Sequence, residues 1–246
     1  MRYFLEVSYK GTSYSGFQSQ KNANTIQAEV EKAFKILLKE EIQLTGSSRT
    51  DTGVHALQNY FHFDTKNELS PQLLYNLNAL LPGEIAMRNL HKVRDEAHCR
   101  FDAITREYKY YVYQKKNPFL GDKAYYYPYA LDLELMQKAA TIIKEYSDFT
   151  SFSKRNTQVK SFTCDIRESH WIIDGECFIY QVKANRFLRG MVRALVATML
   201  KVGRNKITPD NFRAIIESQD CTLADFSAPP EGLFLVQVAF PNNYFN

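Results

Sequence analysis

The sequence lacks the cysteine and histidine patterns that support structural metals or disulfide frameworks. Four cysteines are spread along 246 residues, with no Cys-x-x-Cys pair and no histidine at zinc-finger spacing. We therefore expect neither a structural metal site nor a set of disulfides. A chain of this length can bury one large core or two ordinary ones without such cross-links.

Long hydrophobic runs are also missing. No segment approaches the ~20 uninterrupted apolar residues that a membrane-spanning helix requires. At the N-terminus, Glu6 interrupts the apolar residues before they could form a signal peptide. The hydrophobic content of 45% and the charged content of 24% are those of a soluble globular protein. We expect a cytoplasmic protein without a membrane partner.

Neither sign of charge dominates, since 31 Lys and Arg residues face 27 Asp and Glu residues, for a net charge of +4. That balance fits a nucleic-acid partner and many metabolic enzymes alike. The local pattern says more, because basic and aromatic residues alternate over residues 106–111 and basic residues recur at 115–116, 154–155 and 186–193. The pattern favours a surface that binds phosphates and bases; aromatic strands with ordinary solvated lysines are the alternative.

Two similar units are predicted, because each half of the chain begins with an alternating aromatic strand and continues to an amphipathic helix. The first unit spans residues 1–100 and the second spans residues 101–246. Mostly antiparallel strands combined with helices indicate an α+β fold. Strands are expected at residues 3–9, 42–44, 56–64, 85–93, 108–113, 161–169, 176–184 and 233–240, and helices at 25–40, 71–81, 133–146, 187–202 and 209–218.

The most distinctive stretch is a polar loop, residues 46–56, between two expected strands. It carries Arg49, Asp51 and His55 within seven residues. Taken alone, the Asp-Thr-Gly sequence at 51–53 predicts a turn, because a short carboxylate can bond nearby backbone N–H groups and glycine tolerates positive φ.

This loop closely resembles the catalytic loop of the tRNA pseudouridine synthase A (TruA) family, whose pattern is roughly G-R-T-D-A-G-V-H-A/G. Residues 49–51 and 53–56 match that pattern, while Ser48 and Thr52 stand where many members have glycine and alanine. We expect these two small residues to alter loop packing only. Further matching blocks follow in the family's order along the chain, at residues 9–18, 78–82, 100–103, 106–108, 148–152, 187, 191–193 and 231–233.

The resemblance implies the pseudouridine synthase fold, in which two ferredoxin-like or RRM-like units carry mostly antiparallel sheets and the active-site cleft lies between them. It implies an isomerase that converts uridine to pseudouridine at positions 38, 39 and 40 in the anticodon stem-loop of tRNAs. It also implies a homodimer in which both subunits contact RNA. The reaction rejoins the same uracil through C5, so atoms and oxidation state are conserved and neither a metal nor an organic cofactor is expected.

Site residues carry over from the family position by position. Asp51 would be the nucleophile, and Arg193 would be the partner that keeps its carboxylate ionised against the effect of burial. Tyr108 would stack on the target uracil, and Arg49 would help to hold the flipped nucleotide. Arg189 lies four residues before Arg193, on the same face of the expected helix, and would contact phosphates.

Several alternatives stay open at this point. The rivals are a synthase of the same family acting on other RNA uridines, a catalytically inactive tRNA-binding module, and a retaining nucleoside hydrolase that would release free uracil. For His55 a structural hydrogen bond is favoured over an acid–base role, because no serine or cysteine nucleophile accompanies it. Direct attack at C1′ and a glycal route are not distinguished, and Tyr108 or a water could remove the C5 proton.

Overall fold

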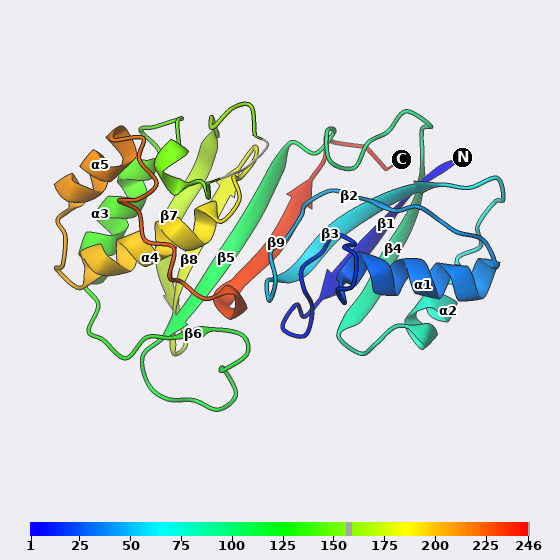
Figure 1. Ribbon diagram of the computed structural model, residues 1–246, viewed down its shortest axis with the longest axis horizontal. Coiled ribbons are helices and arrows are strands. Elements are labelled where there is room, and N and C mark those ends of the chain that lie inside the picture. Colours follow the sequence, from blue (N-terminus) through cyan, green and yellow to red (C-terminus); the bar gives the residue numbers. More distant parts are fainter. Residues whose placement is uncertain (156–158, 246) are drawn as a thin grey trace. The chain divides into compact units, whose positions relative to one another are not determined.

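The computed structural model describes residues 1–155 and 159–245, and the chain forms two compact units (Figure 1). Unit 1 comprises Met1–Thr105 and Phe234–Asn246, and unit 2 comprises Arg106–Leu233. Both units combine helices with a mostly antiparallel sheet, so the predicted α+β class is confirmed. Among the described residues, no helix is long and apolar enough to cross a membrane.

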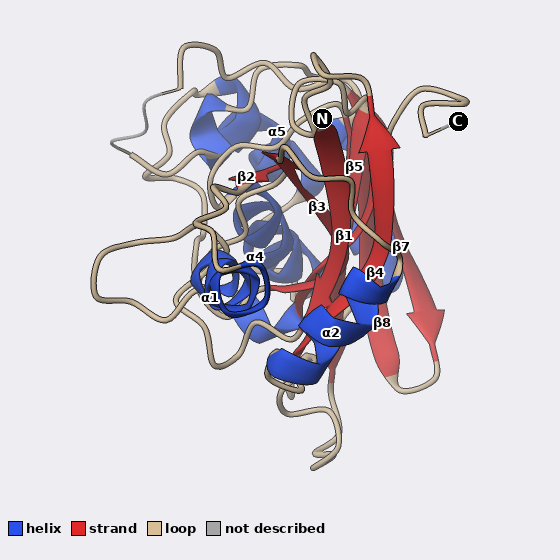
Figure 2. Cartoon of the chain, turned by 90° about the vertical axis from the view of Figure 1, so that its right-hand side faces the viewer, coloured by secondary structure: helices blue, strands red, loops and turns tan. Residues whose placement is uncertain are grey.

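The sheet of unit 1 has the strand order β4-β1-β3-β9, with the short β2 paired to β3. All pairings are antiparallel except that between β3 and β9. Helix α1 lies on one side of these strands (Figure 2), where Phe34 packs against Phe63 with ring centroids 5.0 Å apart. The elements are β1 (Arg2–Tyr9), α1 (Ile26–Leu38), β2 (Thr45–Gly46), β3 (His55–Asp64), α2 (Gln72–Leu80), β4 (Ile85–Val93) and β9 (Leu233–Ala239).

In unit 2 the strand order is β5-β8-β7, with β6 paired in parallel to β5. Helix α4 is buried along nearly its whole length, and α3 packs between α4 and β7, where the Ser169 hydroxyl donates to the Ala140 carbonyl oxygen at 2.8 Å. The elements are β5 (Thr105–Tyr113), β6 (Tyr125–Tyr126), α3 (Leu133–Ile143), the 3-10 turn η1 (Thr150–Phe152), β7 (Ile166–Asp174), β8 (Cys177–Ala184), α4 (Met191–Gly203), α5 (Pro209–Glu217) and the 3-10 turn η2 (Pro230–Gly232).

Most of the predicted elements are present, and the best-matched ones have clear local signals. The strand predicted at residues 85–93 is β4. Helix α1 begins after Thr25, whose hydroxyl accepts a hydrogen bond from the Ala28 N–H at 3.3 Å, as an N-cap residue should. The strand expected at 42–44 is wrong, because pairing with β3 starts only at Thr45.

The start of α4 also differs from the prediction. The apolar pattern predicted a helix from residue 187, but α4 begins at Met191. Gly190 adopts a left-handed conformation with φ of 76° and becomes the N-cap, so the residues before it cannot continue the helix backward. Arg189 therefore lies in the preceding turn, and the shared helical face expected for Arg189 and Arg193 does not exist.

The C-terminal segment lies in unit 1, although the sequence pattern placed it with residues 101–233. Its aromatic side chains surround Phe4 of β1, with ring centroids 5.6 Å away for Phe240, 5.8 Å for Tyr244 and 6.0 Å for Phe245. Phe4 is fully buried by these contacts. Packing between the two ends of a chain leaves no local periodicity, so the sequence pattern did not predict it.

We predict that unit 1 loses stability in mild acid because of His62 on β3. Burial, helped by His98 and Arg2, lowers the pKa of His62 to about 4. Between pH 6.5 and about 4, His62 is protonated in the unfolded chain but stays neutral in the folded protein. The free energy of unfolding is therefore unaffected by His62 above pH 6.5 and falls as the pH drops toward 4, at roughly 1.4 kcal/mol per pH unit. Urea unfolding at pH 7 and 5 should show this slope, and His62→Gln should make it shallower. An unchanged slope in a folded His62→Gln protein would refute the assignment.

Candidate active site

The loop between β2 and β3 presents the predicted nucleophile. Asp51 is half-buried and Arg49 is exposed. The turn predicted at 51–53 is present: the Val54 N–H donates to the Asp51 carbonyl oxygen at 3.2 Å, and Gly53 has a φ of 79°. Positive φ at the third position is the requirement of a type II turn, which explains the glycine.

A buried amide clamps the start of this loop. The Asn59 side chain on β3 donates to the Ser48 carbonyl oxygen at 2.8 Å and accepts from the Ser48 N–H at 3.2 Å, so both backbone groups of Ser48 are bound. Asn59 also donates to the Tyr9 hydroxyl at 3.3 Å, which shares a 2.7 Å hydrogen bond with the Thr50 hydroxyl. These side chains tie the residues before Asp51 to two strands of the unit 1 sheet. We call this set, Asn59 with Tyr9, Ser48 and Thr50, the Asn59 clamp.

The segment after β1 supports the other side of the loop. The Phe17 N–H donates to the Thr50 carbonyl oxygen at 3.2 Å, and the Gly53 N–H donates to the Tyr14 carbonyl oxygen at 3.3 Å. Gly11 lies so close to Val54 that an added Cβ would be 2.0 Å from its carbonyl oxygen. The backbone is thus hydrogen-bonded on both sides of Asp51, at Ser48 and Thr50 before it and at Gly53 after it.

His55 has a structural role at the start of β3, as favoured from the sequence. Its side chain is buried, and its Nδ1 accepts a hydrogen bond from the Gly11 N–H at 3.2 Å. The ring also stacks on Phe234 of β9, with centroids 4.5 Å apart and an interplanar angle of 20°. His55 therefore connects β3, β9 and the segment after β1.

The side chains of Ser47 and Ser48 contribute no hydrogen bond to the loop. The Ser47 and Ser48 hydroxyls are buried and have no hydrogen-bond partner among the described residues. The Asn59 clamp holds Ser48 through its backbone groups alone, and a glycine at this position could be held in the same way. The side chain of Ser48 is therefore not needed for the loop geometry.

The other predicted site residues belong to unit 2. Tyr108 on β5 is 9% exposed, and its ring meets Phe187 edge-on, with centroids 5.0 Å apart at 84°. This contact fixes the ring plane of Tyr108. Arg189 is exposed in the turn before α4, where its carbonyl oxygen accepts from the Lys154 N–H at 3.1 Å.

Arg193 lies in the first turn of α4, where a cation is unfavourable because the helix N-terminus carries partial positive charge. Its half-buried side chain is fixed by a 2.6 Å hydrogen bond from Nε to the Ala228 carbonyl oxygen. The next carbonyl, that of Pro229, accepts from the Tyr110 hydroxyl at 2.8 Å. Helix stability does not explain this arginine, so a functional reason is favoured.

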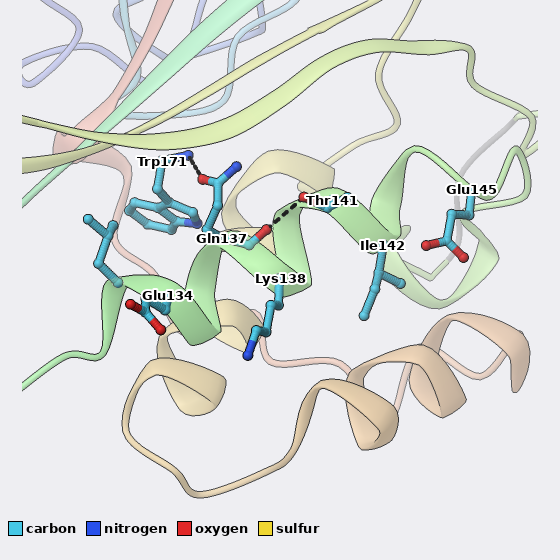
Figure 3. Close-up of a pocket in the computed structure, with 8 residues that line it drawn as sticks. Glu134, Gln137, Lys138, Thr141, Ile142, Glu145 and Trp171 are labelled. Carbon is cyan, nitrogen blue, oxygen red and sulfur yellow. Dashed lines mark hydrogen bonds between the residues drawn. The ribbon is translucent and has the colours of Figure 1, made fainter.

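A cavity of unit 2 contains none of the predicted site residues. It has a volume of about 680 Å³ and is lined by side chains of α3, by Glu145 just after this helix and by Trp171 (Figure 3). Gln137 closes its wall by accepting a hydrogen bond from the Trp171 N–H at 2.8 Å. Over residues 1–155 and 159–245, no group of three His, Cys, Asp or Glu side chains is placed to hold a metal ion.

Arg49 and Asp51 thus belong to unit 1. The other predicted site residues belong to unit 2; they are Tyr108, Arg189 and Arg193. The sequence pattern did not indicate Asn59, which holds the loop from β3, eleven residues after Ser48. The sequence did contain a sign of this role. Asn59 is a polar residue on the face of β3 that also carries the buried Phe61 and Phe63, and a buried amide needs hydrogen-bond partners.

Comparisons with known proteins point to one family. A family model described as tRNA pseudouridine synthase matches residues 6–102 and 146–241. A protein of Parabacteroides distasonis is 43% identical over 99% of this chain and 98% of its own length. Proteins of Porphyromonas gingivalis and Staphylococcus aureus are 40% and 37% identical, over 99% of this chain and 99% and 93% of their own lengths. All three are named tRNA pseudouridine synthase A.

We predict that Gly11→Ala displaces the loop. The new Cβ would overlap the Val54 carbonyl oxygen, a backbone atom that cannot move aside alone, so unfolding free energy should fall by about 1–3 kcal/mol or more. Gly83→Ala is the matched control, since no atom lies within 4 Å of its added Cβ. Urea unfolding and amide exchange at Gly53 and Val54 measure the effect. Equal stability and exchange in both variants would contradict the close approach.

Proposed function

The chain belongs to the tRNA pseudouridine synthase family, and we propose on this basis that it converts uridines 38, 39 and 40 of the tRNA anticodon stem-loop into pseudouridine. It is an isomerase that acts on uridine in tRNA. The observation that carries the proposal is the loop with Arg49, Thr50 and Asp51, which matches the family's catalytic pattern and is held by the Asn59 clamp.

In the proposed reaction Asp51 acts on the ribose of the target uridine. Its carboxylate attacks the sugar or stabilises the positive charge that develops when the N-glycosidic bond breaks, as carboxylates do in retaining glycosidases. The released uracil anion turns and forms a bond from C5 to C1′, which displaces Asp51 from the sugar if an ester has formed. The proton on C5 then leaves to a base or to solvent, and N1 takes up a proton in its place. No atom is gained or lost and no electrons are transferred, so the reaction requires no redox partner.

The other site residues are proposed to hold the base and the charge. Tyr108 stacks on the flipped uracil, and the edge-on contact with Phe187 supports this role because a ring with a fixed plane loses little freedom on stacking. Arg193 keeps the Asp51 carboxylate ionised, and its bond to Ala228 restricts the side chain. Arg49 helps to hold the flipped nucleotide, and the exposed Arg189 contacts phosphate.

We further propose that the enzyme works as a homodimer in the cytoplasm, with both subunits in contact with the anticodon stem-loop. The resemblance of the whole chain to the tRNA pseudouridine synthase A family supports this part of the proposal. Size-exclusion chromatography with light scattering tests the dimer directly, because a monomer at working concentration would contradict it.

We predict that Asp51→Asn abolishes turnover. The change removes the nucleophilic charge with little change of shape, so the rate should fall on the order of a thousandfold or more while tRNA affinity stays near that of the wild type. Asp95→Asn removes the same charge from an 83% exposed side chain of unit 1 and should remain active. Tritium release from C5 of labelled uridine measures turnover, and mapping of the product identifies the positions.

Each outcome of this experiment has a distinct meaning. The proposal is supported if the wild type and Asp95→Asn release tritium at positions 38 to 40 and Asp51→Asn does not. Free uracil among the products would indicate a hydrolase, and tight tRNA binding without release would indicate a binding module. Release at other uridines would change the substrate but not the chemistry. Normal turnover by a verified Asp51→Asn protein would refute the assignment of the nucleophile.

A further inference from the structure

Three tyrosine rings and one arginine lie in contact in unit 2. The tyrosines belong to residues 103–145, which neither segment of the family match covers, and the arginine follows the end of α4. Tyr125 and Tyr127 have centroids 5.3 Å apart, and Tyr127 and Tyr129 have centroids 5.0 Å apart. The Arg204 guanidinium lies 3.7 Å from the Tyr129 centroid and donates to the Tyr127 hydroxyl at 3.4 Å. We call these four residues the tyrosine platform.

The backbone of this segment is anchored at several points. Strand β6 pairs with the end of β5, and the Tyr127 N–H donates to the Tyr113 carbonyl oxygen at 2.8 Å. The Gln114 side chain donates to the Tyr129 carbonyl oxygen. Beyond the platform, the Asp132 N–H donates to the Gly203 carbonyl oxygen at 2.8 Å, next to Arg204. The rings are therefore held in place before any ligand binds, which lowers the entropic cost of stacking on them.

Burial in the core does not explain Tyr129, although Tyr125 and Tyr127 of the platform are half-buried. Tyr129 is 46% exposed and the adjacent Tyr126 is 42% exposed. In the preceding loop, Phe119 is 83% exposed although its N–H is fixed by the Asn117 side chain at 2.9 Å. Several exposed aromatic side chains on an anchored segment are typical of a binding surface rather than of a core.

The charges around the platform fit a polyanion. The exposed cations of this part of unit 2 form no ion pair with any described residue; they are Lys115, Lys116, Lys123 and Lys206. Several nearby acidic groups have partners: Asp225 pairs with Lys201 at 2.9 Å, Asp132 caps α3 by accepting from the Leu135 N–H at 3.0 Å, and Glu176 accepts from the Asn117 side chain at 2.6 Å. The surface therefore combines exposed aromatic side chains with exposed lysines that form no ion pair with a described residue, which is a combination that binds single-stranded nucleic acid.

We propose that the tyrosine platform is a second RNA-binding site, on which an unpaired nucleotide of the tRNA stacks, distinct from the uridine that reacts. Tyr129 and Arg204 supply the stacking surface, and Lys115 and Lys116 bind the neighbouring phosphates. This inference rests on the proposed function only in taking tRNA as the ligand. The platform adds affinity to the enzyme–tRNA complex and performs no chemistry.

The stacking part of the proposal is tested at Tyr129 by measuring the Kd for tRNA. Tyr129→Leu removes the aromatic face and should raise the Kd roughly tenfold, with a parallel rise in KM. Tyr129→Phe keeps the face and should bind like the wild type. Tyr75→Leu is the matched control, because Tyr75 is 71% exposed on α2 of unit 1, and its Kd should not change. Circular dichroism checks that each variant is folded.

The phosphate part is tested by the salt dependence of the Kd. The double variant Lys115→Gln with Lys116→Gln should reduce the slope of log Kd against log salt by about one to two, one for each phosphate that the protein no longer neutralises. Lys32→Gln with Lys66→Gln removes the same charge from exposed positions of unit 1. A smaller reduction in this control shows that the effect depends on position and not on net charge.

The proposal is overturned if folded Tyr129→Leu and the Lys115/Lys116 double variant bind tRNA with the wild-type Kd and slope. It is also overturned if Tyr75→Leu or the Lys32/Lys66 pair weakens binding as much. A wild-type protein that binds tRNA but forms no pseudouridine would refute the proposed function instead. The Kd values of the variants would still show whether the tyrosine platform binds tRNA.

Discussion

The hydrogen bonds of the buried Asn59 amide are the constraint on which the geometry of the proposed active site depends. They bind both backbone groups of Ser48, three residues before Asp51, and they reach the Thr50 hydroxyl through Tyr9. Buried amides are costly unless their donors and acceptors are paired, so the loop and the clamp stabilise each other. The clamp thus fixes the backbone that carries Asp51, the proposed nucleophile.

In unit 2 as well, contacts within the protein fix the side chains of the proposed site. These are Tyr108, proposed to stack on the base, and Arg193, proposed to keep the carboxylate ionised. Gly190 stops α4 from extending backward, and the bond from Arg193 to Ala228 then sets the direction of the guanidinium. Phe187 sets the ring plane of Tyr108. Side chains held before the substrate arrives do not need to be ordered during the reaction, so positioning and charge can lower the reaction barrier.

The sequence predicted what depends on local pattern and missed what depends on distant contacts. The period of α1 with its cap at Thr25, the strand β4 and the turn at Gly53 all have signals within a few residues, and each is confirmed. The start of α4 was misjudged because the apolar periodicity continues through a glycine that takes positive φ. The partner of Ser48 lies eleven residues away on β3, and the cover of Phe4 comes from the opposite end of the chain, so local patterns indicated neither pairing.

The central claim, that the Asn59 clamp positions Asp51 for chemistry, is tested most directly by the single-turnover rate of pseudouridine formation in Asn59→Ala. Loss of the amide frees the backbone groups of Ser48 without touching Asp51, Tyr108 or Arg193. We expect a folded protein that binds tRNA with the wild-type Kd and reacts at least about tenfold more slowly, because misplacing a catalytic group costs rate rather than affinity. A folded Asn59→Ala protein that reacts at the wild-type single-turnover rate would contradict the claim.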